Sequence, residues 1–207
     1  QLNDKFKFFE NNDLKEFTQI ILDECDNNYI GVVPGALTTI NHYGLLANAG
    51  ADQSNVSDSS AILLPKNCKK SAKTLYVKIL ENTGKNVGII IADSRTMPMR
   101  LGTVGTALAT FGFASVIDER GKSDLFGRPM HMTSRAVADQ LATAAEIVMG
   151  ETDERIPFVI IRNFPLLQIS EADEEDISDL IPADLCMFIG PLLPCIREKI
   201  QGETKND

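Results

Sequence analysis

Residues 45–55 (LLANAGADQSN) and 88–94 (GIIIADS) are the two stretches around which the rest of the chain is arranged. The first is a small-residue loop whose last four residues include the acid Asp52, a hydroxyl and an amide. The second is an apolar run that ends abruptly in Asp93 and Ser94. Apolar runs of this length are typical of buried strands, and functional side chains are often placed just beyond such strands. The pattern predicts a site where the two segments meet.

Asp52 and Asp93 are candidate ligands of a divalent cation. Two hard oxygen donors from separate segments suit Mg²⁺ or Mn²⁺ clamped onto a nucleotide phosphate, and the Ser94 hydroxyl adds a third oxygen. A second acidic loop at residues 150–154 (GETDE) could complete a two-metal site. The residues alone leave a plainer interpretation open, in which these carboxylates cap turns or lie on a solvated surface.

Composition narrows the class of protein. A chain of 207 residues with 43% hydrophobic residues is long enough for one domain with a real core. The net charge of −9 disfavours a nucleic-acid footprint or an anionic membrane surface. The four dispersed cysteines show no CxxC pairing, which disfavours a zinc site or a disulfide framework. No signal peptide or membrane-span-length apolar run is recognisable, so we expect a cytoplasmic protein.

Periodicity and turn signals predict the order of secondary structure. Helices are expected over residues 13–25, 71–81 and 133–149, the last capped by Thr133 or Ser134. Strands are expected over residues 29–33, 38–46, 86–92 and 156–161. The irregular alternation favours a single α+β domain over residues 1–207, with a mixed sheet, packed helices and an acidic C-terminal extension over residues 164–207. Neither a P-loop nor a Rossmann glycine motif is present.

A series of motifs resembles one known family, the coenzyme F420-0:gamma-glutamyl ligases. The series begins with GLLANAGADQSN and continues through LLPKN and IIIADS. It then runs through ALATFGFASVIDERGKSDLFGR, TSRAVADQLATAAEIVMGETDERIP and VIIRN, and together the motifs cover about residues 44–163. Their order and spacing are close to those of the family, which makes the series far more specific than any one motif.

The resemblance implies an archaeal-type, F420-0:gamma-glutamyl ligase-like fold and a GTP-dependent activity. Family members join L-glutamate to the lactate carboxylate of coenzyme F420-0, through an acyl phosphate, with Mg²⁺ or Mn²⁺ bridging the phosphates, and act as homodimers. Carried over by motif, the metal ligands are Asp52, Asp93, Ser94 and Asp153. The nucleotide contacts are Asn55, Glu151, Thr152 and Asp153, and no catalytic residue is assigned.

The sequence also departs from the family pattern. Glu151 stands where glutamine is usual, Ser94 stands where threonine is usual, and the loop RTMPMR at residues 95–100 lacks the family's glycine. The family's opening proline- and glycine-bearing segment is not recognisable over residues 1–30. Two other functions therefore remain as alternatives: a non-catalytic dimeric homologue that binds metal or a small ligand, and a metal-dependent phosphohydrolase.

Overall fold

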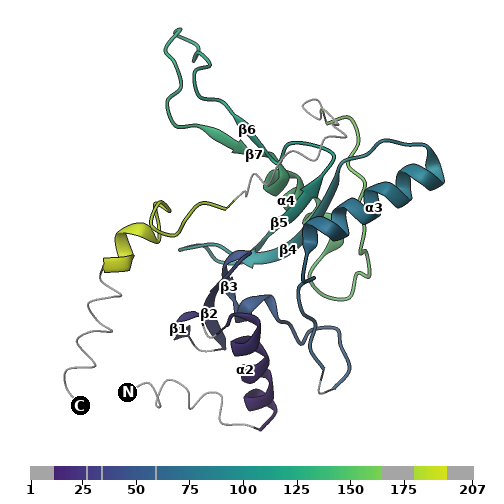
Figure 1. The fold of residues 1–207 in the computed structure, drawn as a ribbon, viewed down its shortest axis with the longest axis vertical. Coiled ribbons are helices and arrows are strands. Elements are labelled where there is room, and N and C mark those ends of the chain that lie inside the picture. The colour runs from purple at the N-terminus through teal and green to yellow at the C-terminus, as the bar shows by residue number, and fades with distance from the viewer. Residues whose placement is uncertain (1–11, 27, 34, 59, 165–179, 195–207) are drawn as a thin grey trace.

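The computed structural model describes residues 12–26, 28–33, 35–58, 60–164 and 180–194, and it confirms an α+β fold built from helices and antiparallel sheets (Figure 1). In chain order the elements are α2 (Asn12–Glu24), β1 (Tyr29–Val33), β2 (Ala36–Asn41), β3 (Gly44–Ala47), η2 (Asn48–Gly50), α3 (Cys68–Thr83), β4 (Ile89–Thr96), β5 (Thr103–Phe111), β6 (Val116–Asp118), β7 (Ser134–Ala136), α4 (Val137–Met149) and η3 (Gly190–Leu192).

The N-terminal part is a three-stranded antiparallel sheet, in the order β1-β2-β3, covered by α2. Its core brings together Ile21 and Cys25 of α2, Leu37 of β2 and two alanines of the following loop. The stretch expected as one strand over residues 38–46 is instead a tight hairpin, because β2 ends at Asn41 and β3 begins at Gly44. The backbone N–H of Tyr43 donates to the Asn41 side chain (2.8 Å), which closes the turn.

The hairpin β4–β5 forms the centre of the molecule and lies between two helices. On one face, Ile89, Ile91 and Phe111 pack against Tyr76 of α3. On the other face, α4 covers the part of the hairpin where Ser94 pairs with Gly105. The register slips between Ile91 and Ala92, so β5 carries one extra residue there. This β-bulge turns the two halves of β5 toward opposite helices.

Helix α4 approaches β5 unusually closely at Gly105. A Cβ atom at this position would lie 2.5 Å from the backbone oxygen of Ala142, closer than atoms can pack. The Thr143 hydroxyl donates to the Gly105 carbonyl (2.8 Å), and the Asp139 carboxylate accepts from the N–H of Ala107 beside the bulge (2.8 Å). The missing side chain of Gly105 therefore permits a close backbone approach, with α4 as the approaching element.

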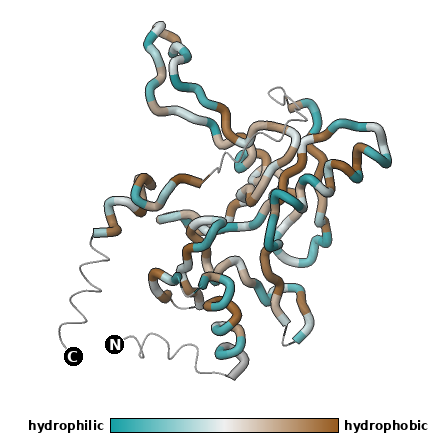
Figure 2. Tube along the Cα trace, viewed as in Figure 1, coloured by the Kyte–Doolittle hydropathy of each residue, from teal (hydrophilic) through white to brown (hydrophobic). Residues whose placement is uncertain are grey.

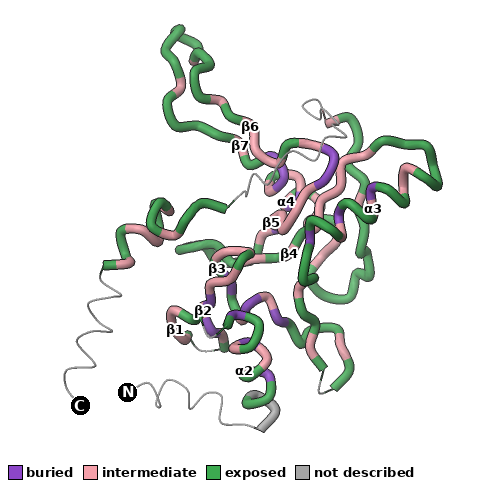
Figure 3. The backbone as a smooth tube through the Cα atoms, viewed as in Figure 1, coloured by how far each residue is buried: buried purple, intermediate pink, exposed green. Residues whose placement is uncertain are grey.

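The strands β6 and β7 form the base of a long arm that projects from the body (Figure 1). Ladder hydrogen bonds continue beyond them, from the Glu119 N–H to the Thr133 carbonyl (3.0 Å) and from the Gly121 N–H to the Met130 carbonyl (2.9 Å). Leu125 and Phe126 at its end are 100% and 81% exposed. Figure 2 shows where hydrophobic residues gather along the trace, and Figure 3 shows the arm as exposed over most of its length.

Two element boundaries and one expected strand differ from the expectations. Strand β4 does not end before Asp93 but continues to Thr96, so Asp93 and Ser94 lie within the hairpin ladder. The C-terminal helix begins at Val137, because residues 134–136 pair with β6 and Ala136, not Thr133 or Ser134, is the N-cap. Residues 156–161 are not a strand, since they have no partner strand among the described residues. The acidic run over residues 171–179 lies outside the described residues.

No helix of the described residues is both long and apolar enough to cross a membrane.

Substitution of Gly105 tests whether the close approach of α4 stabilises the fold. We expect Gly105→Ala to lower the free energy of unfolding by about 2 kcal/mol, because the new methyl group meets a helix backbone that cannot move aside. Equilibrium urea unfolding measures the change. Gly31→Ala in β1 is the matched control, since nothing lies within 4 Å of its added Cβ. Equal stability of the two variants would contradict the close approach.

Candidate functional site

A cleft of about 300 Å³ opens beside the β4–β5 hairpin, at the C-terminal end of α4. Its walls come from the middle of β4, from Gly105 of β5, from one face of α4, from the loop after α4 and from one residue of the Asp52 loop. The lining residues are Asn55, Ala92, Asp93, Ser94, Gly105, Ala142, Glu146, Met149, Gly150, Glu151, Thr152, Glu154 and Arg155. Segments almost a hundred residues apart in the sequence therefore share one cleft.

Asp93 and Arg95 form a half-buried ion pair on β4. The Nε atom of Arg95 lies 3.6 Å from Oδ2 of Asp93, and the two side chains are 15% and 25% exposed. Burial raises the pKa of Asp93, and the nearby charge of Asp52 adds to the rise, although Arg95 opposes both. Burial likewise lowers the pKa of Arg95.

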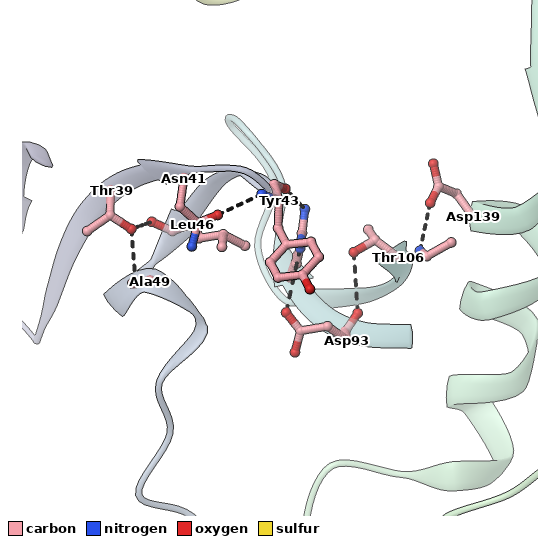
Figure 4. Close-up of polar contacts among 10 residues, drawn as sticks. Thr39, Asn41, Tyr43, Leu46, Ala49, Asp93, Thr106 and Asp139 are labelled. Carbon is pink, nitrogen blue, oxygen red and sulfur yellow. Dashed lines mark hydrogen bonds and ion pairs between the residues drawn. The ribbon is translucent and has the colours of Figure 1, made fainter. Parts of the chain in front are cut away.

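Tyr43 connects the N-terminal sheet to this ion pair (Figure 4). Its backbone carbonyl accepts from Nη1 of Arg95 (3.0 Å). Its hydroxyl donates to the Pro65 carbonyl (2.6 Å) and accepts from the backbone N–H of Cys68 at the start of α3 (3.1 Å). One residue of the β2–β3 turn thus holds β4 and α3 in place around Asp93.

The loop that carries Asp52 is fixed from the inside by a buried hydroxyl. Thr39 is fully buried; its Oγ1 accepts from the Ala49 N–H (2.9 Å) and donates to the Leu46 carbonyl (3.1 Å) (Figure 4). The Asp52 carboxylate accepts from the backbone and the hydroxyl of Ser54 (3.0 and 2.9 Å). This local turn leaves one carboxylate oxygen, Oδ2, without a bond to Ser54.

Asn55 ties the two halves of the site together. It adopts a left-handed backbone conformation (φ 56°), and its side-chain amide donates to the Thr152 carbonyl (2.9 Å), 97 residues further along the chain. Across the same loop, the Glu154 carboxylate accepts from the backbone N–H of Thr152 (2.9 Å). The loop after α4 is therefore held against the Asp52 loop by the Asn55–Thr152 hydrogen bond, and the Glu154–Thr152 bond fixes the shape of the first of these loops.

Glu146 faces the cleft from α4. Its Oε1 atom is buried and has no hydrogen-bond partner among the described residues. Burial, the neighbouring Glu151 carboxyl and the charge of Asp93 raise the pKa of Glu146 to about 7, against a smaller opposing effect of the Gly105 backbone. A carboxyl group that ionises near neutrality in a cleft is the kind of perturbed group found at functional sites.

The structure brings most of the predicted residues together. Asn55, Asp93, Ser94, Glu151 and Thr152 line the cleft, and Asp52 lies beside it. Asp153 is exposed and is absent from the lining, so it does not join the others in this arrangement. No group of three or more His, Cys, Asp or Glu side chains within the described part of the chain is placed to hold a metal ion. Metal and nucleotide binding by these residues stay predictions.

Comparison with known proteins decides the family. Residues 1–163 match the family described as F420-0:Gamma-glutamyl ligase. The chain belongs to this family. The match includes the first 43 residues, which the motif series starting at residue 44 leaves out. It ends at residue 163, where that series also ends.

Relatives with the name coenzyme F420:L-glutamate ligase are similar to most of the chain. The protein from Methanococcus maripaludis (strain C7) is 44% identical over 152 residues, which are 73% of this chain and 60% of that protein. The one from Methanocaldococcus jannaschii is 44% identical over 145 residues, 70% of this chain and 57% of that protein. The one from Archaeoglobus fulgidus is 36% identical over 168 residues, which are 78% of this chain and 67% of that protein. The aligned region thus spans about 60% of the length of the first of these relatives.

Two charged lining residues of this F420-0:gamma-glutamyl ligase family member were not predicted from the sequence, Glu146 and Arg155. Glu146 lies in the alanine-rich stretch of α4, where a lone glutamate is typical of a solvated helix face. The signal that could have found it is its spacing: Asp139, Thr143 and Glu146 follow one another at helical intervals along the face that meets β5. Arg155 follows the acidic loop, and no local pattern distinguishes it from a surface arginine.

The raised pKa of Glu146 predicts how stability depends on pH. The folded chain binds the proton more tightly than the unfolded chain, whose pKa is near 4.5, so this group's stabilisation is complete below pH 4.5 and is lost as the pH rises through 7. Glu146→Gln mimics the protonated acid. We expect it to match the wild type at pH 4.5 and to be more stable at pH 8 by ~1 kcal/mol, since solvent screens much of the effect.

Urea unfolding of both proteins between pH 4.5 and 8, without divalent cations, measures this difference. Glu81→Gln on the exposed face of α3 is the control and should show no such trend. A difference between the wild type and Glu146→Gln that does not change with pH would contradict the raised pKa.

Proposed function

We propose that this chain catalyses the ligation of L-glutamate to the carboxylate of coenzyme F420-0, with GTP as co-substrate and Mg²⁺ or Mn²⁺ as the divalent cation. The observation that carries the proposal is the cleft, which joins the Asp52 loop, the Asp93–Ser94 pair and the loop after α4 in a chain of this ligase family. The expected route is phosphorylation of the acceptor carboxylate by GTP, followed by attack of the glutamate amine and release of phosphate.

The donor set fits a phosphate-bound divalent cation better than a closed protein cage. Magnesium is usually held by one or two carboxylates, with substrate phosphates and waters completing its shell. Asp52 and Asp93 supply two such carboxylates, and Ser94 supplies a hydroxyl oxygen. The raised pKa of Asp93 is what a carboxylate shows when its burial and a like-charged neighbour are not fully compensated by a cation. A bound divalent cation would neutralise the phosphates and polarise the phosphoryl group.

The residues of the chain would position the nucleotide and orient the carboxylate ligands of the cation. Asn55 and Thr152 are already bonded to each other, so a nucleotide bridging their loops meets a preorganised surface. Arg95 keeps the Asp93 carboxylate oriented on β4. No disulfide joins the three described cysteines, Cys25, Cys68 and Cys186, which agrees with the cytoplasm, where we place the reaction.

We propose in addition that the active form is a homodimer. Besides Leu125 and Phe126 on the arm, Ile147 and Val148 of α4 are 84% and 54% exposed. Exposed large apolar residues grouped on projecting elements are typical of surfaces that a partner covers. A second copy of this chain is the partner that the family resemblance implies.

Removal of the Asp52 carboxylate tests the metal-nucleotide site. We expect the wild type to bind GTP only with Mn²⁺ or Mg²⁺, and Asp52→Asn to weaken that binding at least about tenfold, since one charged ligand of the cation is lost. Isothermal titration calorimetry with and without Mn²⁺ measures both. Asp58→Asn in the exposed loop that follows is the matched control. Unchanged GTP binding by Asp52→Asn would remove this residue from the site.

The same purified chain distinguishes the ligase from its alternatives. Formation of a glutamyl product from coenzyme F420-0, L-glutamate and GTP supports the ligase. Phosphate release from GTP without any acceptor supports a phosphohydrolase, and binding without turnover supports a non-catalytic homologue.

Substitution at the end of the arm tests the dimer. We expect the wild type to have twice the mass of the chain in size-exclusion chromatography with light scattering. The double variant Leu125→Ser, Phe126→Ser should shift toward the monomer, because it removes apolar surface that the partner covers. Ser123→Ala on the same arm is the control. A monomeric wild type would refute the dimer, and a fully dimeric double variant would exclude the arm as its contact.

A further inference from the structure

Glu146 is the one cleft carboxylate whose oxygen is buried and unpartnered within the described part of the chain. The Glu154 carboxylate is already engaged by the backbone and hydroxyl of Thr152 (2.9 and 3.2 Å). The Asp93 carboxylate is engaged by Arg95. A buried acceptor that is left unsatisfied costs free energy, so the position favours a ligand that donates to it.

Glu146 enters the cleft from α4, on the side of Ser94. Side chains alternate along β4, so Ser94 faces α4 and Glu146, whereas Asp93 shares its face with Arg95, next to the Tyr43 turn. Glu146 and its neighbour Glu151 form an acidic pair on the α4 side of the cleft.

The composition of the cleft indicates a small ligand with charges of both signs. Its volume of about 300 Å³ is at the lower limit for ligand pockets, which is enough for an amino acid. Besides the acidic pair, the lining contains one cationic side chain, Arg155.

We propose that Glu146 binds the ammonium group of the incoming amino acid, and that Arg155 binds a carboxylate of the same molecule. The inference rests on the proposed ligase function, because it assigns the binding place of the substrate amine. An ammonium group has three donors and no acceptor, and a charge-assisted bond to Glu146 would satisfy its orphaned oxygen. Glutamate presents two carboxylates, and the planar guanidinium of Arg155 matches either.

Calorimetric titration with L-glutamate and with glutarate tests the assignment, since glutarate has both carboxylates but no amine. We expect the wild type to bind L-glutamate more tightly than glutarate. Glu146→Gln should weaken L-glutamate binding about tenfold or more, and it should not weaken glutarate binding, because glutarate has no ammonium group for Glu146 to bind. Arg155→Gln should weaken both ligands. Glu81→Gln, exposed on α3, is the matched control, and thermal unfolding of each variant confirms that it is folded.

Three results would overturn the inference. They are no binding of L-glutamate to the wild type, equal binding of L-glutamate to the wild type and Glu146→Gln, and loss of Mn²⁺ binding in Glu146→Gln with L-glutamate binding intact. The last would make Glu146 a cation ligand. The ligation assay is read separately: L-glutamate binding through Glu146 without ligation would refute the proposed function alone, and ligation without this dependence would refute the inference alone.

Discussion

The close approach of α4 to β5 at Gly105 is the contact on which the geometry of the cleft depends. The helix is held there by two bonds on one face, from Thr143 to the Gly105 carbonyl and from the Ala107 N–H to Asp139. The β-bulge lies next to the second bond, because the register slips between the Ile91–Ala109 and Ala92–Ala107 pairs. Glu146 lies further along the same face, so the bonds that fix the helix also fix the carboxylate.

A second constraint is the buried charge of Arg95, which joins the N-terminal sheet to the central hairpin. Burying a guanidinium is costly unless it is paired. Here the pairing is partial: Nη1 donates to the Tyr43 carbonyl, Asp93 is 3.6 Å from Nε, and neither Nε nor Nη2 donates a hydrogen bond to any residue that the structure describes. Because Asp93 also partners Arg95, its orientation in the cleft is set by the contact between the two sheets. The β2–β3 turn is thus part of the site without lining it.

The sequence predicts the parts of this structure that depend on local pattern. Helical periodicity located α2 and α3, and the apolar run before Asp93 located β4, although that strand continues to Thr96. The register of β4 and β5 could not be predicted, since no local pattern marks the extra residue of the bulge, and the bond of the Ala107 N–H to Asp139 involves another element. Residues 156–161 have the composition of a strand, yet strand formation needs a neighbouring strand, and the described residues offer none. The acidic residues of the loops were recognisable as site candidates. Glu146 was not, because only the close approach of α4 to Gly105 brings it into the cleft.

The cleft carboxylates Asp93 and Glu146 are both destabilised in their charged forms. Asp93 and Glu146 both have raised pKa values, for the same reasons: burial and like-charged neighbours. The folded chain therefore holds negative charges closer together than their mutual repulsion favours, and Arg95 relieves only one of them. A ligand that brings positive charge to the cleft relieves this repulsion, and the free energy so gained adds to its affinity. The electrostatics of such a site favour ligands with cationic groups even without shape complementarity, because the cleft carboxylates repel a purely anionic ligand.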